Sequence, residues 1–475
     1  MAVPSCPGCC ERDVRIAQLE SRLAELEAKV REQAHLILDL ARKLQDQDLP
    51  KTGTPGQPGD AAKPPPRQAS RRKPGAQPGH PPHLKQLLPP QRVTQTKTFV
   101  PSHCQQCQQP LPATPQPHDP PPTRFQVAEL PELKADVVEY QGHARTCPCC
   151  GKVNRAPIPA ALCSHSVGPG LAALMSFLVG SCGLSKRRVE EVVEAVFEVP
   201  VAVGTVAKLE QEMSAALEPA HRQALAAVQA APVKHLDETG WKKAGHKRWL
   251  WVAATSMVVV FLIHRLRNAA VVVQLLGQTL RGILCSDRWR AYDCVPLLQR
   301  QVCWAHLKRN FDKLVQRGGR AKKLGDDCLA IKDRVFERWH LFRGGGLTRR
   351  QLDDHVAPLA LELLAVLQRG ERSRDGTTAR FCRRVLQVYL ALWTFVVVEG
   401  VEPTNNHAER VQRLAVLYRK NCFGCHSDQG CRFVERLLTV VQTLRLQKRP
   451  VLQYLKDTLI AHRSCTAPPS LALAG

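Results

Sequence analysis

The hydrophobic pattern of the chain changes after Pro232, where helical spacing gives way to short runs typical of strands. The second and third runs predict a hairpin across Thr255 and Ser256. Strands interleaved with helices predict an α/β domain over 232–316, and the rest of the chain is assigned around it. Strands are predicted over 233–237, 248–254, 258–264, 283–286 and 301–304, and helices over 268–280 and 306–315.

Acidic residues stand at the ends of two of these strands. Asp237 ends the first strand, and Asp287 follows the fourth. Three strands, a helix, a strand, and then a strand and a helix is the order of a ribonuclease H-like fold. In that order, adjacent strands would bring both carboxylates within reach of a shared metal ion. Glu238, beside Asp237, is either a partner of the site or a solvated side chain.

A third carboxylate, Glu409, lies early on a helix predicted to begin near 404–406. Residues 317–401 are helical and form a predicted insertion, after which the core resumes over 402–447. Carboxylates from three separate segments can hold two Mg²⁺ or Mn²⁺ ions, which clamp the attacking and leaving oxygens of a phosphodiester. An alternative exists for Glu409, because Asn406 three residues earlier completes the pattern of a capping box.

Two CxxC pairs predict a structural zinc site within a module over 101–155. Each pair places two thiols on one side of a tight turn, and four thiolates satisfy tetrahedral zinc. His103 and Cys149 are alternative ligands. An ion with four protein ligands has no open position, so it would serve folding and DNA contact rather than catalysis. The predicted zinc ligands are Cys104, Cys107, Cys147 and Cys150.

Residues 1–49 carry a coiled-coil pattern, with a seam at alternating steps of three and four and charged residues on its flanks. Such a pattern predicts a homo-oligomer; the alternative is an amphipathic helix packed on its own protein. Residues 50–100, rich in Pro, Gly, Lys and Arg, predict an extended basic linker. The seam residues are Ile16, Leu19, Leu23, Leu26, Val30, Gln33, Ile37, Leu40 and Leu44.

Residues 160–231 are helical throughout. A helix, a short connection and a second helix over 186–217 have the outline of a helix-turn-helix DNA-binding unit. Its recognition helix would start at Gly204 or Thr205. A helical hairpin that supports the next domain fits this pattern equally well. A C-terminal helix and tail occupy 448–475.

The charge of the chain indicates a polyanionic partner. Lys and Arg number 67 against 42 Asp and Glu, a net charge of +25, and nucleic acid is the commonest partner of so basic a chain. No secretory signal is visible, and the longest apolar run, 249–263, is shorter than the ~20 residues of a membrane span. These features predict a cytoplasmic protein without a membrane partner. The 19 scattered cysteines do not fit a secreted disulfide framework.

In combination, the motifs resemble those of the transposases of the insertion sequence 66 family, a DDE class of bacterial mobile elements. The resemblance implies a catalytic triad of Asp237, Asp287 and Glu409 in a nucleoid-associated enzyme. It implies cleavage at terminal inverted repeats, strand transfer into target DNA, and small companion proteins encoded by the element. The resemblance spans nearly the whole chain. The matching motifs are RRKPGAQPGH, HCQQC, CPCCG, HLDETGW, CSDRWRAY, CWAHLKRNF, NNHAERVQRLAVLYRKN and VQTLRLQKRPVLQYLKDTL.

The chain departs from this family pattern at two places. Thr404 stands where the family usually carries Asp, and CFGCHSDQGC replaces an aromatic and apolar segment. These departures leave open the alternative of a DNA-binding regulator, against which the intact triad counts. A further alternative is a metal-dependent nuclease without strand transfer, against which the coiled coil counts. The second departure creates a cluster that is either packing thiols or a second zinc knuckle: Cys422, Cys425, His426 and Cys431.

Overall fold

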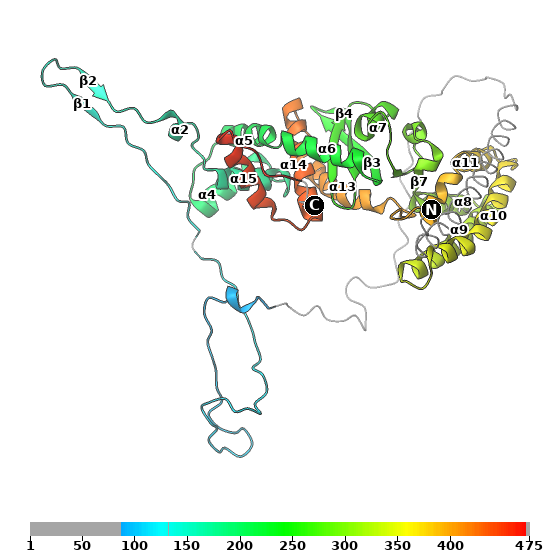
Figure 1. Cartoon of the computed structure of the whole chain (residues 1–475), viewed down its shortest axis with the longest axis horizontal. Coiled ribbons are helices and arrows are strands. Elements are labelled where there is room, and N and C mark those ends of the chain that lie inside the picture. The colour runs from blue at the N-terminus through cyan, green and yellow to red at the C-terminus, as the bar shows by residue number, and fades with distance from the viewer. Residues whose placement is uncertain (1–86, 132, 472–475) are drawn as a thin grey trace, which may run out of the picture. The chain divides into compact units, whose positions relative to one another are not determined.

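The computed structural model describes residues 87–131 and 133–471 (Figure 1). The chain divides into two compact units, 1–127 and 128–475, and each is described by itself. The predicted coiled coil and most of the predicted linker lie outside the described residues. In the first unit, a short 3₁₀ helix, Pro90–Arg92, precedes an extended segment in which a bridge between His103 and Pro110 closes a turn.

A five-stranded mixed sheet forms the centre of the second unit. Its strand order is β5-β4-β3-β6-β7: the β5-β4-β3 part is antiparallel, and β3, β6 and β7 are parallel. The predicted hairpin across Thr255 and Ser256 is confirmed as β4 paired with β5. The strands are β3 Val233–Lys243, β4 His246–Ala254, β5 Val259–His264, β6 Ile283–Ser286 and β7 Arg300–Val302.

The first strand of the sheet is longer than predicted. The prediction that it ends at Asp237 is wrong, because β3 continues to Lys243 and pairs with β4 through a second hairpin. Ala244 and Gly245 close this hairpin with positive φ angles of 48° and 78°, as a tight two-residue turn requires. Asp237 therefore lies within a strand that is held on both sides.

Helices cover the sheet on its two faces (Figure 1). Within β6, Leu284 packs into one hydrophobic core, while Ile283 and Cys285 pack into the other. This division follows from the alternation of side chains along a strand. The helices of the sheet region are α7 Ala269–Leu276, α8 Trp304–Gln316, α13 Asn406–Cys422, α14 Asp428–Leu446 and α15 Val451–Arg463.

The segment before the sheet begins with a small hairpin, β1 Ala144–Thr146 with β2 Val153–Arg155, and is then helical. The proposed recognition helix, α5, starts at Val203 and packs against α3, α4, α14 and α15. The helices are α2 Ala160–Cys163, α3 Pro169–Gly180, α4 Lys186–Phe197, α5 Val203–Ala216 and α6 Glu218–Ala230.

Residues 317–401 are helical, as predicted, and have a hydrophobic core of their own that continues onto α8, β6 and β7. A capping box of Thr348 and Gln351 starts the second long helix. Among the described residues, none of the helices is long and apolar enough to cross a membrane. The helices of this insertion are α9 Gly319–Arg343, α10 Arg349–Glu371, α11 Gly376–Leu386 and α12 Thr394–Val397.

Candidate functional site

Asp237 lies on the face of β3 that turns toward α13. Its neighbours at steps of two show this orientation: Thr239 accepts a hydrogen bond from Arg419 of α13 at 3.0 Å, and Trp241 stacks on Tyr418 of α13 with ring centroids 6.0 Å apart. Because residues two apart along a strand share a face, Asp237 points toward the start of α13.

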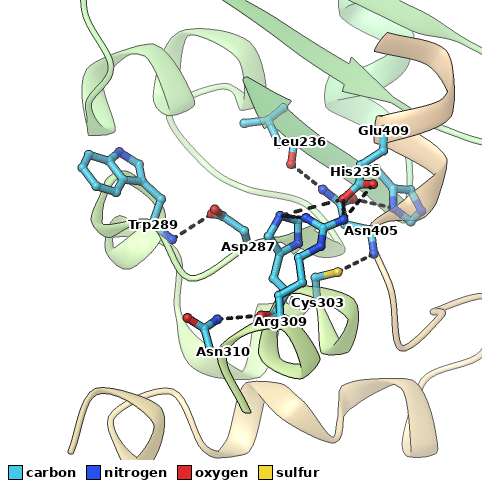
Figure 2. Close-up of polar contacts among 10 residues, drawn as sticks. His235, Leu236, Asp287, Trp289, Cys303, Arg309, Asn310, Asn405 and Glu409 are labelled. Carbon is cyan, nitrogen blue, oxygen red and sulfur yellow. Dashed lines mark hydrogen bonds and ion pairs between the residues drawn. The ribbon is translucent and has the colours of Figure 1, made fainter. Parts of the chain in front are cut away.

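Asp287 lies level with Asp237 on the neighbouring strand. The parallel pairing of β3 and β6 joins Val233 to Ile283 and His235 to Cys285. Continued by two residues, this register sets Asp237 opposite Asp287, which directly follows β6. One carboxylate oxygen, Oδ1, accepts the backbone N–H of Trp289 at 2.8 Å (Figure 2), so the side chain is fixed at the carboxyl end of the strand.

Glu409 lies in the first turn of α13, and it is not part of a helix cap. The N-cap residue is Asn405, and no side-chain hydrogen bond caps this helix. The capping-box interpretation is therefore wrong. Instead, the Glu409 carboxylate lies 3.4 Å from the Arg309 guanidinium (Figure 2). It also lies 3.8 Å from His306 Nε2, and both residues belong to α8.

The buried Asn405 fastens α13 to the sheet. Its Nδ2 donates to the carbonyl of Leu236 at 2.8 Å, and its Oδ1 lies 3.0 Å from His235 Nδ1. Its backbone N–H reaches the Cys303 sulfur at 3.1 Å (Figure 2). Since an amide oxygen can only accept, His235 Nδ1 carries the proton. Burial lowers the pKa of His235 to about 4, so its ring is neutral at pH 7.

Burial and the neighbouring carboxylates raise the pKa of Asp237 to about 7. Burial is the largest cause, followed by the charge of Glu238, and the charges of Asp287 and Glu409 add to it. A like charge nearby disfavours ionisation. The three predicted ligands, from β3, β6 and α13, therefore act on one another electrostatically.

Glu238 occupies the opposite face of β3 from Asp237. It is buried, forms an ion pair with Arg267 at 2.6 Å, and accepts a hydrogen bond from the Tyr292 hydroxyl. The interpretation of Glu238 as a solvated side chain is therefore wrong. Asp293 is exposed and lies 3.2 Å from the buried Arg300.

Among residues 87–131 and 133–471, no group of three or more His, Cys, Asp or Glu side chains stands ready to hold a metal ion. The chemistry of the donors nevertheless suits Mg²⁺ or Mn²⁺, since carboxylate oxygens are the ligands these hard ions prefer. A cation would also relieve the repulsion between the carboxylates, which adds to the effect of burial on the pKa of Asp237. Arg309 compensates the charge of Glu409, whereas burial lowers the pKa of the neighbouring His306.

The two CxxC pairs form matching turns. Four residues after the first cysteine, Gln108 and Gly151 both have positive φ, at 59° and 71°, and each donates its N–H to the carbonyl of that cysteine. Backbone N–H groups, those of Cys107 and Cys150 foremost, lower the pKa of the Cys104 and Cys147 thiols. Each turn thus stabilises a thiolate, the form that binds zinc.

The second cysteine cluster gives no support to a zinc knuckle. Cys425 and Cys431 are buried, Cys422 is half-buried, and His426 is exposed. The thiols of Cys425 and Cys431 hydrogen-bond to each other, and this contact and burial raise the pKa of Cys425. These cysteines pack into the hydrophobic core near the connection between α13 and α14.

Sequence reasoning missed Asn405 and His235. Asn405 was visible as the first residue of the NNHAER stretch, and His235 as the start of HLDETGW. Arg419 of α13 donates hydrogen bonds to the Thr239 hydroxyl and to the carbonyl of Gly240. Arg410, Arg413 and Lys420 of α13 are exposed.

A family model described as "Transposase IS66 family" matches residues 165–432, more than half of the chain. The chain belongs to this family. The matched range includes the sheet, the insertion and all three carboxylates. The five-stranded α/β structure is compatible with the core of a DDE transposase, and membership of the IS66 family implies a nucleic-acid-processing enzyme.

A relative of this IS66 family chain is the uncharacterized protein y4qI of Sinorhizobium fredii (strain NBRC 101917 / NGR234). It is 27% identical over 239 residues, which make up 45% of this chain and 43% of that protein. The chain thus matches less than half the length of this relative.

Proposed function

We propose that this protein is a DDE transposase with a ribonuclease H-like core, which binds the ends of a mobile element and catalyses DNA strand cleavage and strand transfer. The observation that carries the proposal is the parallel register of β3 and β6, which, continued by two residues, sets Asp237 opposite Asp287. Asp237, Asp287 and Glu409 come from three separate segments, and a site for divalent cations would draw its carboxylate oxygens from all three.

Asp237, Asp287 and Glu409 would hold two Mg²⁺ or Mn²⁺ ions. When bound, these ions activate the attacking oxygen and stabilise the leaving oxygen of the phosphodiester. The N–H of Trp289 orients the Asp287 carboxylate. Asn405 fixes the first turn of α13, and with it Glu409, against β3. Arg309 and His306 hold the Glu409 side chain beside α8.

The other parts of the chain would serve DNA binding and assembly. We propose that zinc bound by Cys104, Cys107, Cys147 and Cys150 stabilises a module that contacts DNA. Residues 1–49 would pair two copies of the chain, because joining two element ends needs an assembly. The substrate places this activity in the bacterial cytoplasm, on the nucleoid, together with companion proteins of the element.

The test is cleavage and joining of labelled element-end DNA by the full chain with Mn²⁺. We expect Asp287→Asn to bind the DNA normally and to lose cleavage by more than about 100-fold, since removing groups that merely support metal ligands already costs 10–100-fold. The matched control is Asp326→Asn, which alters an exposed carboxylate paired with Lys322 on α9. This variant should cleave like the parent.

Other outcomes would separate the alternatives. Joining that survives Asp287→Asn contradicts the assignment of the metal ligands. Cleavage without joining by the parent indicates a nuclease. Tight binding of the element ends without cleavage by the parent indicates a DNA-binding regulator.

A further inference from the structure

A basic cleft lies between the sheet region and the insertion. Its volume is about 1300 Å³, and its lining runs from Asp287 along α8 to α11. Of the described residues that line it, Asp287 and Asp293 carry carboxylates, and Asp293 is paired with Arg300. The cations of the lining are Arg288, Arg290, Arg300, Arg309, Lys313, Arg380, Arg383 and Arg384.

One face of helix α11 carries positive charge and lines this cleft. Its residues at 377, 380, 381 and 384 follow helical spacing and line the cleft. Its other face, with Cys382 and Val385, is buried in the core of the insertion. Arg380 and Arg384 are exposed, and within the described part of the chain no ion pair or hydrogen bond is formed by either. Arg383 is paired with Glu371 at 3.2 Å.

Buried polar atoms along the cleft lack partners. Arg288 Nε and His306 Nδ1 both line it, and each is buried without a hydrogen bond to any described residue. An unpaired buried donor costs free energy. Seven further cations line the cleft together with Arg288, against the two carboxylates of Asp287 and Asp293. This surface therefore has too few anions for its cations.

We propose that the cleft binds a single DNA strand beside the scissile phosphate, with Arg380 and Arg384 as positioning residues. The proposal deepens the proposed function and rests on it for the identity of the substrate. Guanidinium groups match phosphate geometry. Trp289 of the lining is 38% exposed, and Arg267 lies 4.1 Å from the centre of its ring. Basic grooves with exposed aromatic side chains are typical of single-strand binding.

The size of the cleft favours one strand over a duplex. The cavity of about 1300 Å³ can hold only a short stretch of one strand, whereas a full turn of duplex occupies a several-fold larger volume. The strand would pass along α11 and end at Asp287. This binding would give a role to the insertion between Asp287 and Glu409. Its helix α11 would form one side of the cleft that leads to the catalytic carboxylates, opposite α8.

The first experiment measures DNA binding by the full chain in EDTA, where cleavage cannot occur. The probes are a fluorescent single-stranded oligonucleotide of mixed sequence and its duplex, followed by anisotropy over a range of salt concentrations. The variant is Arg380→Glu/Arg384→Glu, and the matched control is Arg320→Glu/Arg350→Glu, which changes exposed arginines of the insertion outside the cleft lining.

For the cleft variant, we expect the Kd of the single strand to rise at least tenfold. The slope of log K against log salt should fall by about 1.4, since each phosphate contact with a single strand contributes ~0.7. Duplex binding and the control variant should change less than threefold. Equal single-strand affinities of the cleft and control variants would overturn the proposal, and so would an equal loss of duplex binding.

A second experiment uses the parent protein and does not depend on the folding of a variant. Cys294 is exposed and lines the cleft, while Cys182 is exposed outside it, and burial raises the pKa of both thiols. We expect the bound oligonucleotide to slow alkylation of Cys294 by N-ethylmaleimide but not that of Cys182. Unchanged alkylation of Cys294 at saturating DNA would contradict the proposal.

The two proposals can fail separately. Normal single-strand binding by the cleft variant, with cleavage still dependent on Asp287, would remove the cleft proposal alone. Protection of Cys294 by a single strand in a protein that never cleaves element-end DNA would remove the catalytic proposal alone.

Discussion

At the scale of single residues, Asn405 determines where the third carboxylate lies. Two adjacent asparagines precede α13, and the structure gives them different roles. Asn405 is fully buried and joins β3 to the start of the helix, while Asn406 is exposed on the first turn. The local pattern of Asn406 and Glu409 matches a capping box, but the contacts of Asn405 with β3 leave Glu409 directed at Arg309.

We expect Asn405→Ala to lower the free energy of unfolding of the α/β unit by about 1–3 kcal/mol, the cost of leaving a buried polar group without its partner. The carbonyl of Leu236 and the ring of His235 would both lose a bond. Denaturant unfolding followed by circular dichroism measures this change. Asn406→Ala should cost less than about 0.5 kcal/mol, and an equal cost for both variants would contradict this role of Asn405.

At the scale of elements, the edge of the sheet is completed by side chains of α14. Strand β5 is an edge strand, and its outward N–H groups would lack partners in the sheet. Glu435, Thr439 and Thr443, spaced four residues apart, accept the N–H groups of Ile263, Phe261 and Val259 at 2.6, 2.9 and 3.0 Å. Successive turns of one helix thus match alternate residues of one strand.

The Thr439→Val substitution tests this arrangement. It keeps the volume of the side chain but leaves the buried N–H of Phe261 unpaired, so we expect a loss of about 1–3 kcal/mol in the free energy of unfolding. In the control, Thr458→Val, the lost hydroxyl bonds the carbonyl of Tyr454 within its own helix, so the cost should be smaller. Equal thermal unfolding midpoints of the two variants would count against the pairing.

Glu435 makes stability depend on pH. Burial raises its pKa to about 7, against the opposing hydrogen bond from Ile263. The folded protein thus keeps a proton that the unfolded chain releases near pH 4.5, so this group lowers stability as pH rises from about 4.5 to 7. Glu435→Gln should flatten that decline and add about 0.5–2 kcal/mol at pH 8.

Thermal unfolding in EDTA between pH 4.5 and pH 8 measures the Glu435 effect. The control is Glu337→Gln, which alters an exposed carboxylate on α9 and should leave the pH profile of the parent unchanged. If the thermal unfolding midpoint of Glu435→Gln falls with rising pH as steeply as that of the parent, another group causes the pH dependence of stability.

At the scale of the whole molecule, we expect the full chain to hold about one zinc ion through its two CxxC turns. Cys104→Ser and Cys147→Ser should each abolish zinc binding, because a tetrahedral site needs all four ligands. Elemental analysis by mass spectrometry measures the metal content. Cys163→Ser, at an exposed cysteine outside both turns, should retain zinc. Retention of zinc by Cys147→Ser would disprove this ligand set.

Local patterns in the sequence were sufficient to identify most elements. Strand β6 has the bounds that were predicted for it, and the helical character of residues 317–401 is confirmed. The motifs were sufficient for the family, which the family model confirms over residues 165–432. These features are local because periodicity, turn residues and short motifs involve neighbours along the chain.

Tertiary structure decided which acidic residues can act together. The turn at Ala244 and Gly245 extends β3 past Asp237, burial removes Glu238 from solvent, and Asn405 directs Glu409 away from a cap. The basic cleft joins the loop after β6 to α11, segments about a hundred residues apart. Such contacts depend on the packing of two cores around one sheet. A sequence lists the carboxylates and arginines, but only packing between distant segments sets which of them meet.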